Sequence, residues 1–475
     1  MSDRLTSIRS TLQAHGQEHL LAFHGELDGP RQAQLLHQLQ QIDLPALEIL
    51  LKQSASRDPS AGPPSDLEPA PYHPHHSAGG EAMGHHRSHG ETLIRQGKVA
   101  AFTVAGGQGT RLGWGGPKGT YPATVVTGKP LFRVIAEQIR ANQDRYGVVI
   151  PWYIMTSPLN DTETRAFFQD NNNFGLIRKN MFLFPQAVLP SIDARTGKLL
   201  LASKYQVATN PDGHGGALRA LRASGALEDM TGRGIEHISY FQVDNPLVHI
   251  VDPHFLGLHA AAPDSSAEIS SKMVPKAAHD EQVGVFCRSG GRTVVIEYSD
   301  LPPELAREQD AAGRLRFGAG SIAVHLVSVK FVERLTDDPK RFALPYHRAE
   351  KVVPYVDPDS GELVRPDAPN AVKLEAFVFD ALPLAESSIV YETKRTEEFA
   401  PIKNATGVDS PATSHQLQSD RHGGWLEAHG VKIPRTADGH VDAAIEISPI
   451  TALEAPDLAR VNLPPSIAPG EVVVL

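Results

Sequence analysis

The sequence "KVAAFTVAGGQGTRLGWGGPKG" at residues 98–119 joins an apolar run of strand length to a turn rich in glycine. The helical pattern "LFRVIAEQIRANQDRYG" follows at residues 131–147. Glycine lets backbone N–H groups approach an anion closely, because no Cβ stands in the way. A strand, a glycine-rich turn and a helix in this order are how many α/β proteins bind phosphate. The stretch therefore predicts a phosphate-binding turn in an α/β fold.

Strand and helix patterns continue to alternate after this turn. The runs at residues 148–157 and 235–245 are typical of buried strands, and residues 162–172 have a helical pattern. Such alternation predicts a central, mostly parallel, Rossmann-like nucleotide-binding sheet with helices on both faces. Two runs within residues 283–300 flank Gly290 and Gly291, which predicts a β-hairpin.

Composition shifts divide the chain into three predicted parts. Residues 1–97 hold a helical extension and a loop rich in histidine and proline, residues 98–407 the catalytic domain, and residues 408–475 a small C-terminal β domain. The loop, at about 55–90, has enough histidines to suggest metal binding. No cysteine is interleaved with them, and the prolines and glycines suggest no fixed geometry, so we favour a solvated loop. The histidines are His73, His75, His76, His85, His86 and His89.

The overall composition argues against several classes of protein. A formal net charge of −10 disfavours general binding to nucleic acid, which needs a basic surface. No apolar run reaches the roughly 20 residues of a membrane span, and no signal peptide is visible, so we expect a cytoplasmic protein with no membrane partner. The single cysteine, Cys287, excludes an internal disulfide, and its apolar neighbours predict a buried, unreactive thiol.

The glycine-rich turn matches neither common phosphate-binding fingerprint. A Walker A loop would need Lys-Ser or Lys-Thr after a glycine, and a dinucleotide fingerprint would need the third glycine one residue before Gly113. What remains is Gly-Gly-x-Gly-Thr-Arg-Leu-Gly followed by Pro117 and Lys118. Arg111 and Lys118 are spaced so that both could face one polyphosphate. A turn that merely reversed the chain would leave both cations unexplained.

Other segments have features of ligand contacts when taken together. The segment "NPDGHGGALRAL" at residues 210–221 is either a second close-approach turn or an ordinary loop. Asp244 ends a predicted strand, where a carboxylate suits Mg²⁺, although an Asx-turn before Pro246 is the alternative. Glu297 and Tyr298 end another strand, where a carboxylate could hold sugar hydroxyls. Two lysines, Lys373 and Lys403, stand beside apolar residues.

These motifs, in this order, resemble the eukaryotic-type UDP-N-acetylglucosamine pyrophosphorylases, within the UTP–sugar-1-phosphate uridylyltransferase family. The resemblance covers nearly the whole chain except about 55–90. It is carried by "AHGQEHLLAFHGEL", "VAGGQGTRLGWGGPKG", "PDGHGG", "VDNPL", "EQVGVFCRSGGRTVVIEYSD", "VKLEAFVFDALPLA", "RTEEFAPIKNATGVDSPATSHQ" and "EISPITAL".

The resemblance implies a role for individual residues of this chain. It implies catalytic cations, a carboxylate that holds Mg²⁺ (or Mn²⁺), and contacts to the nucleotide and the sugar. The implied catalytic residues are Arg111, Lys118 and Lys403; the nucleotide-binding residues are Val104, Ala105, Gly106, Gly107, Gly109, Lys118, Gln186, Gly213, Asp244 and Lys373; the sugar-binding residues are His214, Glu297, Tyr298, Ser321 and Lys403; and the metal ligand is Asp244.

Two residues depart from the hexosamine pattern of the family. His214 and Ser321 stand where those members carry asparagines near the sugar. The implied reaction joins UTP to a sugar 1-phosphate, most simply N-acetylglucosamine 1-phosphate, and releases pyrophosphate. Glucose or galactose 1-phosphate is the alternative substrate.

The resemblance also leaves the reaction class and the assembly to be tested. A glycosyltransferase that uses a UDP-sugar, or a non-catalytic UDP-sugar sensor, is a more distant alternative. The implied mechanism is in-line attack on the α-phosphorus of UTP, with positioning and charge neutralisation in place of a general base. The sequence leaves the oligomeric state open, and a monomer is compatible with it.

Overall fold

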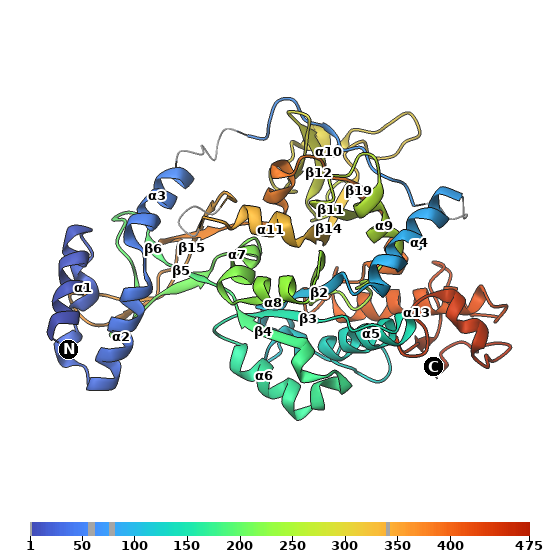
Figure 1. Cartoon of the computed structure of the whole chain (residues 1–475), viewed down its shortest axis with the longest axis horizontal. Helices are drawn as coiled ribbons and strands as arrows, with labels where there is room; N and C mark the ends of the chain where they lie inside the picture. The colour runs from blue at the N-terminus through green and yellow to red at the C-terminus, as the bar shows by residue number, and fades with distance from the viewer. Residues whose placement is uncertain (1, 56–61, 76–80, 339–342) are drawn as a thin grey trace. The chain divides into compact units, whose positions relative to one another are not determined.

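The computed structural model describes residues 2–55, 62–75, 81–338 and 343–475, and it contains two compact units (Figure 1). The smaller unit comprises Met1–Gly62, Gln186–Arg219 and Asp338–Asp380. The larger unit comprises Pro63–Pro185, Ala220–Asp337 and Ala381–Leu475. Each unit therefore combines three segments that are distant in the sequence, and each is described here by itself.

The larger unit is built on one central sheet with the strand order β1-β12-β14-β10-β2-β3-β4. Neighbours β10, β2, β3 and β4 run parallel, whereas β14 pairs antiparallel with β10. This arrangement confirms the predicted mostly parallel α/β sheet. The strands are β1 (Glu68–Pro69), β2 (Val99–Val104), β3 (Trp152–Thr156), β4 (Met181–Pro185), β10 (His237–Gln242), β11 (Ile269–Pro275), β12 (Val285–Ser289), β13 (Arg292–Ile296), β14 (Ala319–Ser328) and β19 (Val390–Glu392).

Helices cover the parallel part of this sheet, as the buried strand sequences require. Helix α5 (Leu131–Tyr146) ends at Gly147, whose φ of 65° is the left-handed conformation that glycine adopts without strain. Its residue Phe132 packs at ring distances of 6.3 Å from Trp152 on β3 and 4.8 Å from Phe168 on α6 (Asp161–Asp170). The other main helices of this unit are α8 (Ala226–Gly232), α9 (Pro253–Ala261), α10 (Pro303–Arg307), α11 (Val329–Leu335) and α12 (Arg395–Glu398).

The predicted hairpin is confirmed as β12 and β13, which pair antiparallel from Val285 with Ile296 to Ser289 with Arg292. Gly290 and Gly291 both have positive φ, 55° and 76°, as a two-residue hairpin turn of this kind needs. Cys287 lies on β12 with no exposed surface, and burial raises its pKa to about 12. The prediction of a buried, unreactive thiol is therefore confirmed.

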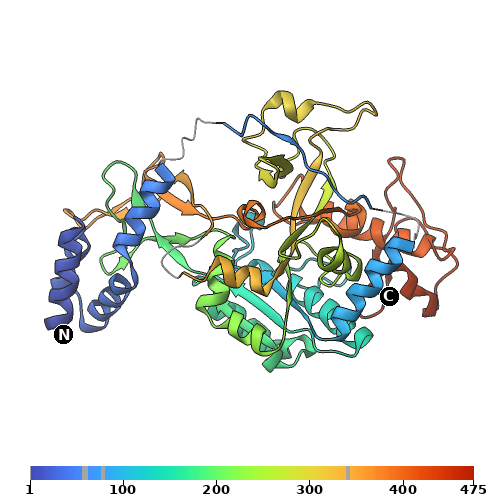
Figure 2. The ribbon, with the colours of Figure 1, turned by 45° about the horizontal axis from the view of Figure 1, so that its top comes forward.

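The expectation of a loop through residue 90 is wrong at its end, because residues Glu81–Arg95 form helix α4. Helix α4 lies beside α9 in both views (Figures 1 and 2). A Cβ added to Gly90 would lie 1.8 Å from the Pro253 carbonyl oxygen, and one added to Gly257 would lie 1.8 Å from that of His86. The glycines that resemble loop residues in the sequence thus allow two helices to pack closely. His76 lies outside the described residues.

The C-terminal part of the larger unit has a hydrophobic cluster of its own. Helix α13 (Pro411–Glu427) begins at a capping box formed by Ser410 and Thr413, and it contributes Trp425 and Leu426 to the cluster. Strands β20 (Ala444–Glu446) and β21 (Val472–Val474) pair in parallel beside it.

Among the described residues, no helix of the chain has both the length and the apolar character needed to cross a bilayer.

The smaller unit combines helices with short strands. Its sheet β15-β18-β6 is antiparallel, and the strand pairs β5–β9, β7–β8 and β16–β17 accompany it. The elements of this unit are α1 (Ser2–Ala14), α2 (Gly29–Gln41), α3 (Leu44–Ala55), β5 (Val188–Pro190), β6 (Ile192–Asp193), β7 (Leu201–Ser203), β8 (Gln206–Val207), β9 (Thr209–Pro211), β15 (His347–Lys351), β16 (Tyr355–Val356), β17 (Leu363–Val364) and β18 (Ala371–Glu375); α7 (Gly216–Ala223) and the 3₁₀ segment η7 (Val378–Leu384) begin in it.

Candidate active site

The glycine-rich turn leaves β2 at Val104 and folds back on itself. The Gly109 N–H donates to the Gly116 carbonyl at 3.0 Å, and the Lys118 N–H donates to the Gly107 carbonyl at 3.1 Å. The buried Asn160 side chain donates to the carbonyls of Ala105 and Gly107 at 3.1 and 3.3 Å. The turn is thus held by its own backbone and by one asparagine that the sequence did not single out.

We expect Gly109→Ala to distort the turn, because an added Cβ would lie 2.6 Å from the Trp114 Cβ. Overpacking of this kind costs about 1–3 kcal/mol, and the same turn contains Gly106 and Gly107 of the predicted nucleotide contact. We therefore expect a lower thermal midpoint and a raised KM for UTP. Gly115→Ala is the matched control, because nothing lies within 4 Å of its added Cβ. Equal effects of the two substitutions would contradict the prediction.

Lys118 and Asp244 meet although 126 residues separate them. Strands β2 and β10 are adjacent and parallel, with Val104 opposite Gln242, so their carboxyl ends meet at one edge of the sheet. The Lys118 Nζ lies 3.2 Å from Asp244 Oδ2, and the two side chains are only 16% and 12% exposed. This pair places a cation and a carboxylate directly beside the glycine-rich turn.

Lys403 reaches the same edge through a backbone contact. The Ile402 N–H donates to the Asp244 carbonyl at 2.9 Å, which fixes the following residue beside Asp244. The Lys403 Nζ lies 3.1 Å from Asp409 Oδ2 and 5.6 Å from the centre of the Phe399 ring. Its side chain is 37% exposed, so the ammonium is open to an anionic ligand.

The other predicted catalytic cation, Arg111, is placed differently. It lies in the 3₁₀ segment η3 (Thr110–Leu112) of the same turn, and it is exposed. Within the described part of the chain, no ion pair or hydrogen bond of its side chain is found. Its guanidinium is therefore available to phosphate oxygens, but no protein contact fixes its position.

Besides Lys403, the predicted sugar contacts of the larger unit lie near the start of β14, at Ser321, and directly after β13, at Glu297 and Tyr298. The Ser321 N–H donates to the Gly284 carbonyl at 2.8 Å. The Glu297 Oε1 lies 3.8 Å from the position of a Cβ added to Gly284. Ser321 and Glu297 therefore lie near each other, because both lie close to Gly284. The side chain of Tyr298 is 46% exposed.

The remaining predicted residues, Gln186, Gly213, His214 and Lys373, lie in the smaller unit. Gln186 is buried and directly precedes Ala187, whose carbonyl accepts from the N–H of Asp212, just before Gly213. Gly213 has a φ of 83°, and an added Cβ would lie 2.3 Å from the Ala376 carbonyl oxygen. The structure thus brings two of the predicted nucleotide-binding residues, Gln186 and Gly213, close together.

His214 and Lys373 lie near this turn, and both are affected by burial. Burial lowers the pKa of His214 to about 4, so its imidazole is neutral near pH 7. Its Nδ1 accepts from the Val378 N–H at 3.2 Å, and the ring packs against Phe377 and Phe379. Burial also lowers the pKa of Lys373, which lies on β18. A neutral His214 can offer a ligand no charge, only a polar N–H edge.

Asp212 is a notable residue that the sequence did not single out. It is fully buried, neither carboxylate oxygen has a hydrogen-bond partner among the described residues, and a Cβ added to Gly216 would lie 2.1 Å from its Oδ1. Burial raises its pKa to about 7, an effect partly offset by Arg219. Only its position before a glycine-rich turn could have drawn attention to it.

The raised pKa of Asp212 predicts a pH-dependent stability. Between about pH 4 and pH 7 the folded chain keeps a proton that the unfolded chain releases, so stability falls as the pH rises through this range. Asp212→Asn removes the ionisation, so we expect the stability of the variant, relative to the unmodified chain, to be greater at pH 8 than at pH 5 by about 3 kcal/mol. Thermal midpoints at the two pH values measure this. The exposed Asp144→Asn is the control, and a pH-independent effect of Asp212→Asn would contradict the prediction.

The donor set at Asp244 fits the implied magnesium ion. Asp244 Oδ2 faces Lys118, and no hydrogen bond to Oδ1 is found among the described residues, which leaves one carboxylate oxygen for a cation. Mg²⁺ in such sites is held by one or two carboxylates, substrate phosphates and water. Asp244 would hold the ion together with the phosphates of a nucleotide.

Comparison with known proteins shows the family to which the chain belongs. The family model for UTP–glucose-1-phosphate uridylyltransferase matches residues 72–421. The chain belongs to this uridylyltransferase family. A uridylyltransferase-family relative is the human UDP-N-acetylhexosamine pyrophosphorylase-like protein 1, which is 37% identical, with 94% of this chain and 92% of the relative covered. The UDP-N-acetylglucosamine pyrophosphorylase of Saccharomyces cerevisiae is 38% identical, with 72% of each chain covered.

Solved structures of uridylyltransferase-family members share the fold. The uridine diphosphate N-acetylglucosamine pyrophosphorylase of Trypanosoma brucei superposes with a TM-score of 0.82 at 26% identity, covering 100% of this chain and 98% of that chain. A UDP-glucose pyrophosphorylase from Leishmania major superposes with a TM-score of 0.61 at 15% identity, covering 92% of this chain and 88% of that one, and this likeness concerns the fold alone. The predicted family and fold class are confirmed.

Proposed function

We propose that this chain is an enzyme that joins UTP to a sugar 1-phosphate and releases pyrophosphate. The observation that carries the proposal is the meeting of Lys118, Asp244 and the Ile402–Lys403 segment beside the glycine-rich turn. A phosphate-binding turn, two cations and one carboxylate are what this reaction needs. The names of the relatives above support the same activity.

The chemical obstacle is repulsion between two anions, and the residues of the site act on it. The nucleophile, a phosphate oxygen of the sugar 1-phosphate, is already charged near neutral pH, so no general base is needed. Lys118 and Lys403 reduce the repulsion as the two phosphates approach, and the N–H groups of the turn orient the UTP phosphates. Arg111 adds a mobile guanidinium.

Asp244 would hold a magnesium ion, which would supply further charge neutralisation between the two phosphates. The same carboxylate keeps Lys118 in place, because Asp244 Oδ2 accepts from the Lys118 ammonium. A glycosyltransferase is less consistent with this arrangement, because it would have no need for cations placed to handle a triphosphate.

We propose N-acetylglucosamine 1-phosphate as the preferred sugar substrate, because relatives at 33% and 38% identity are named as UDP-N-acetylglucosamine diphosphorylase and pyrophosphorylase. Glucose 1-phosphate is the second candidate, on the strength of His214 and Ser321. Both residues differ from the asparagines of the hexosamine pattern.

A pyrophosphate-release assay with UTP and Mg²⁺ tests the proposal. It should compare the 1-phosphates of N-acetylglucosamine, N-acetylgalactosamine, glucose and galactose at equal concentrations. We expect the highest kcat/KM for N-acetylglucosamine 1-phosphate. A higher value for glucose 1-phosphate would select the second candidate, and no pyrophosphate with any sugar phosphate would contradict the proposed activity.

A further inference from the structure

A fully buried lysine in the larger unit is shared by two carboxylates. Lys272 on β11 has no exposed side-chain surface, and its Nζ lies 2.7 Å from Asp252 Oδ2 and 2.5 Å from Glu398 Oε1. Burial by itself would lower the pKa of Lys272, but the two carboxylates raise it above its usual value. Lys272 therefore carries a positive charge that only its protein partners compensate.

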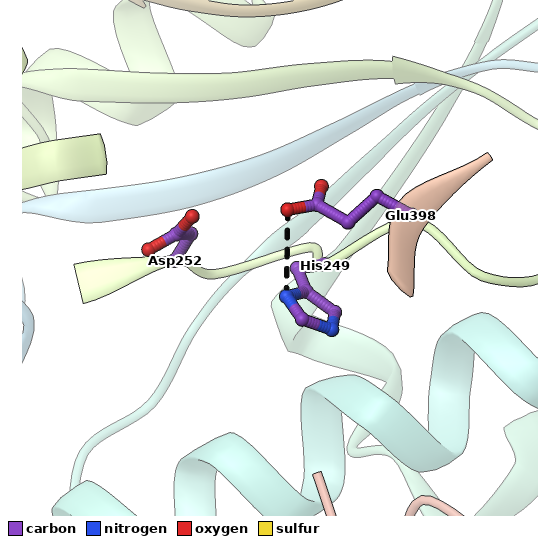
Figure 3. Close-up of side chains that lie close together, drawn as sticks. All are labelled: His249, Asp252 and Glu398. Carbon is purple, nitrogen blue, oxygen red and sulfur yellow. Dashed lines mark ion pairs between the residues drawn. The ribbon is translucent and has the colours of Figure 1, made fainter. Parts of the chain in front are cut away.

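The carboxylates also form, with His249, a group of the composition found in metal sites. Figure 3 shows the three side chains turned toward one another, and one ligand atom of each lies within 4.8 Å of the others. The Lys272 ammonium, however, contacts both carboxylates at hydrogen-bond distance. A metal ion bound there would be repelled by the Lys272 ammonium. We therefore interpret the group as an ion network in which Lys272 is the cation.

The Glu398 end of this network is tied to the candidate active site. The Asn245 side chain, which is buried, donates to the Glu398 carbonyl at 2.6 Å and accepts from the Ala400 N–H at 3.1 Å. Two residues further, the Ile402 N–H donates to the Asp244 carbonyl. Residues 398–402 therefore run along residues 244–245, and Lys403 follows directly.

We propose that Lys272 is a positioning residue, whose ammonium anchors Glu398 and thereby fixes Lys403 beside Asp244. The segment after α12 has no regular structure until α13 begins, so its place depends on such individual contacts. Without the ammonium, the carboxylates of Asp252 and Glu398 would be like charges in a buried site. Glu398 would then move or take up a proton, and the backbone that carries Lys403 would move with it.

A double-mutant cycle tests this inference, which rests on the proposed role of Lys403. Lys272→Met, Lys403→Ala and the double variant are compared by kcat and KM for both substrates. We expect Lys272→Met to lower kcat at least about tenfold while the KM for UTP changes less than about threefold. If Lys272 acts through Lys403, Lys272→Met should reduce kcat less than about threefold further once Lys403 is alanine.

Lys129→Met is the matched control, because it breaks another largely buried lysine pair. The Lys129 Nζ lies 2.8 Å from Glu137 Oε2, with side-chain exposures of 13% and 7%. We expect it to lower the thermal midpoint, to keep kcat within about threefold, and to leave the effect of Lys403→Ala unchanged. A general loss of stability would behave in this way, and a positioning role would not.

A second variant covers the case in which Lys272→Met does not fold. Asn245→Ala leaves the ion network in place and removes the ties to Glu398 and Ala400, so we expect the same non-additivity with Lys403→Ala. If the fold-reductions in kcat of the two single variants multiply in the double variant, the positioning role is overturned and the proposed function still stands. Wild-type activity of Lys403→Ala would overturn the role of Lys403 and, with it, this inference.

Discussion

Replacement of Lys118 by alanine should lower kcat by roughly 10²–10³-fold in a chain that still folds, the size of effect seen when one donor to a developing oxyanion is lost. The side chain is only 16% exposed and lies 3.2 Å from Asp244, so water cannot easily replace the missing charge. Single-turnover pyrophosphate release measures the chemical step separately from product release.

Lys98→Ala is the control for this substitution. Lys98 precedes β2 and pairs with Glu236 at 2.7 Å, but it stands at the opposite end of the strand from the glycine-rich turn. Exposed pairs of this kind contribute little, so we expect kcat within about twofold of the unmodified chain. A Lys118→Ala variant within fivefold of the same reference would remove Lys118 from the mechanism.

Asp244→Asn should have an effect of similar size for a different reason. The amide keeps the shape of the side chain but removes the charge that faces Lys118 and would hold the metal ion. We expect kcat to fall by roughly 10²–10³-fold, and the Mg²⁺ concentration that gives half-maximal activity to rise. A magnesium titration of pyrophosphate release at saturating UTP measures both quantities.

Asp264→Asn provides the comparison, since the Asp264 side chain is 62% exposed and pairs with His73 away from the turn. Its magnesium dependence should match that of the unmodified chain. If Asp244→Asn loses activity but shows an unchanged magnesium dependence, Asp244 holds Lys118 and the metal ligand must be sought elsewhere.

Local patterns were sufficient to predict five strands of the ten-stranded sheet, namely β2, β3, β10, β12 and β13. The strand that ends at Val104, the helix closed by Gly147 and the hairpin at Gly290 each depend on residues close together in the sequence. Helix α4 was missed because glycine and histidine are weak helix formers. Close packing against α9, which lies more than 150 residues away in the sequence, stabilises the helix instead. Packing against a distant partner leaves no trace in local periodicity.

The sequence indicated the candidate site residues one by one but not their arrangement. The sequence indicated Lys118 and Asp244 separately, and only the parallel pairing of β2 with β10 brings them together. Asn160 and Lys272 carried no signal, because each is recognised by its hydrogen-bond or ion-pair partners rather than by its neighbours in the chain. Asp212 was marked only by its position before a glycine-rich turn. The resemblance to a family supplied the roles, whereas the structure supplied the contacts.

Because the Cys287 thiol is buried, the chain is suited to labelling with fluorescent dyes at introduced cysteines. A pKa of about 12 and complete burial leave the native protein with no thiol that a maleimide dye can reach at neutral pH. Cysteines introduced at Ile49 in the smaller unit and Ile177 in the larger unit, which are 55% and 60% exposed, would then be the only reactive positions. A dye at either position would report changes in the surroundings of that residue, within its own unit, as UTP is added.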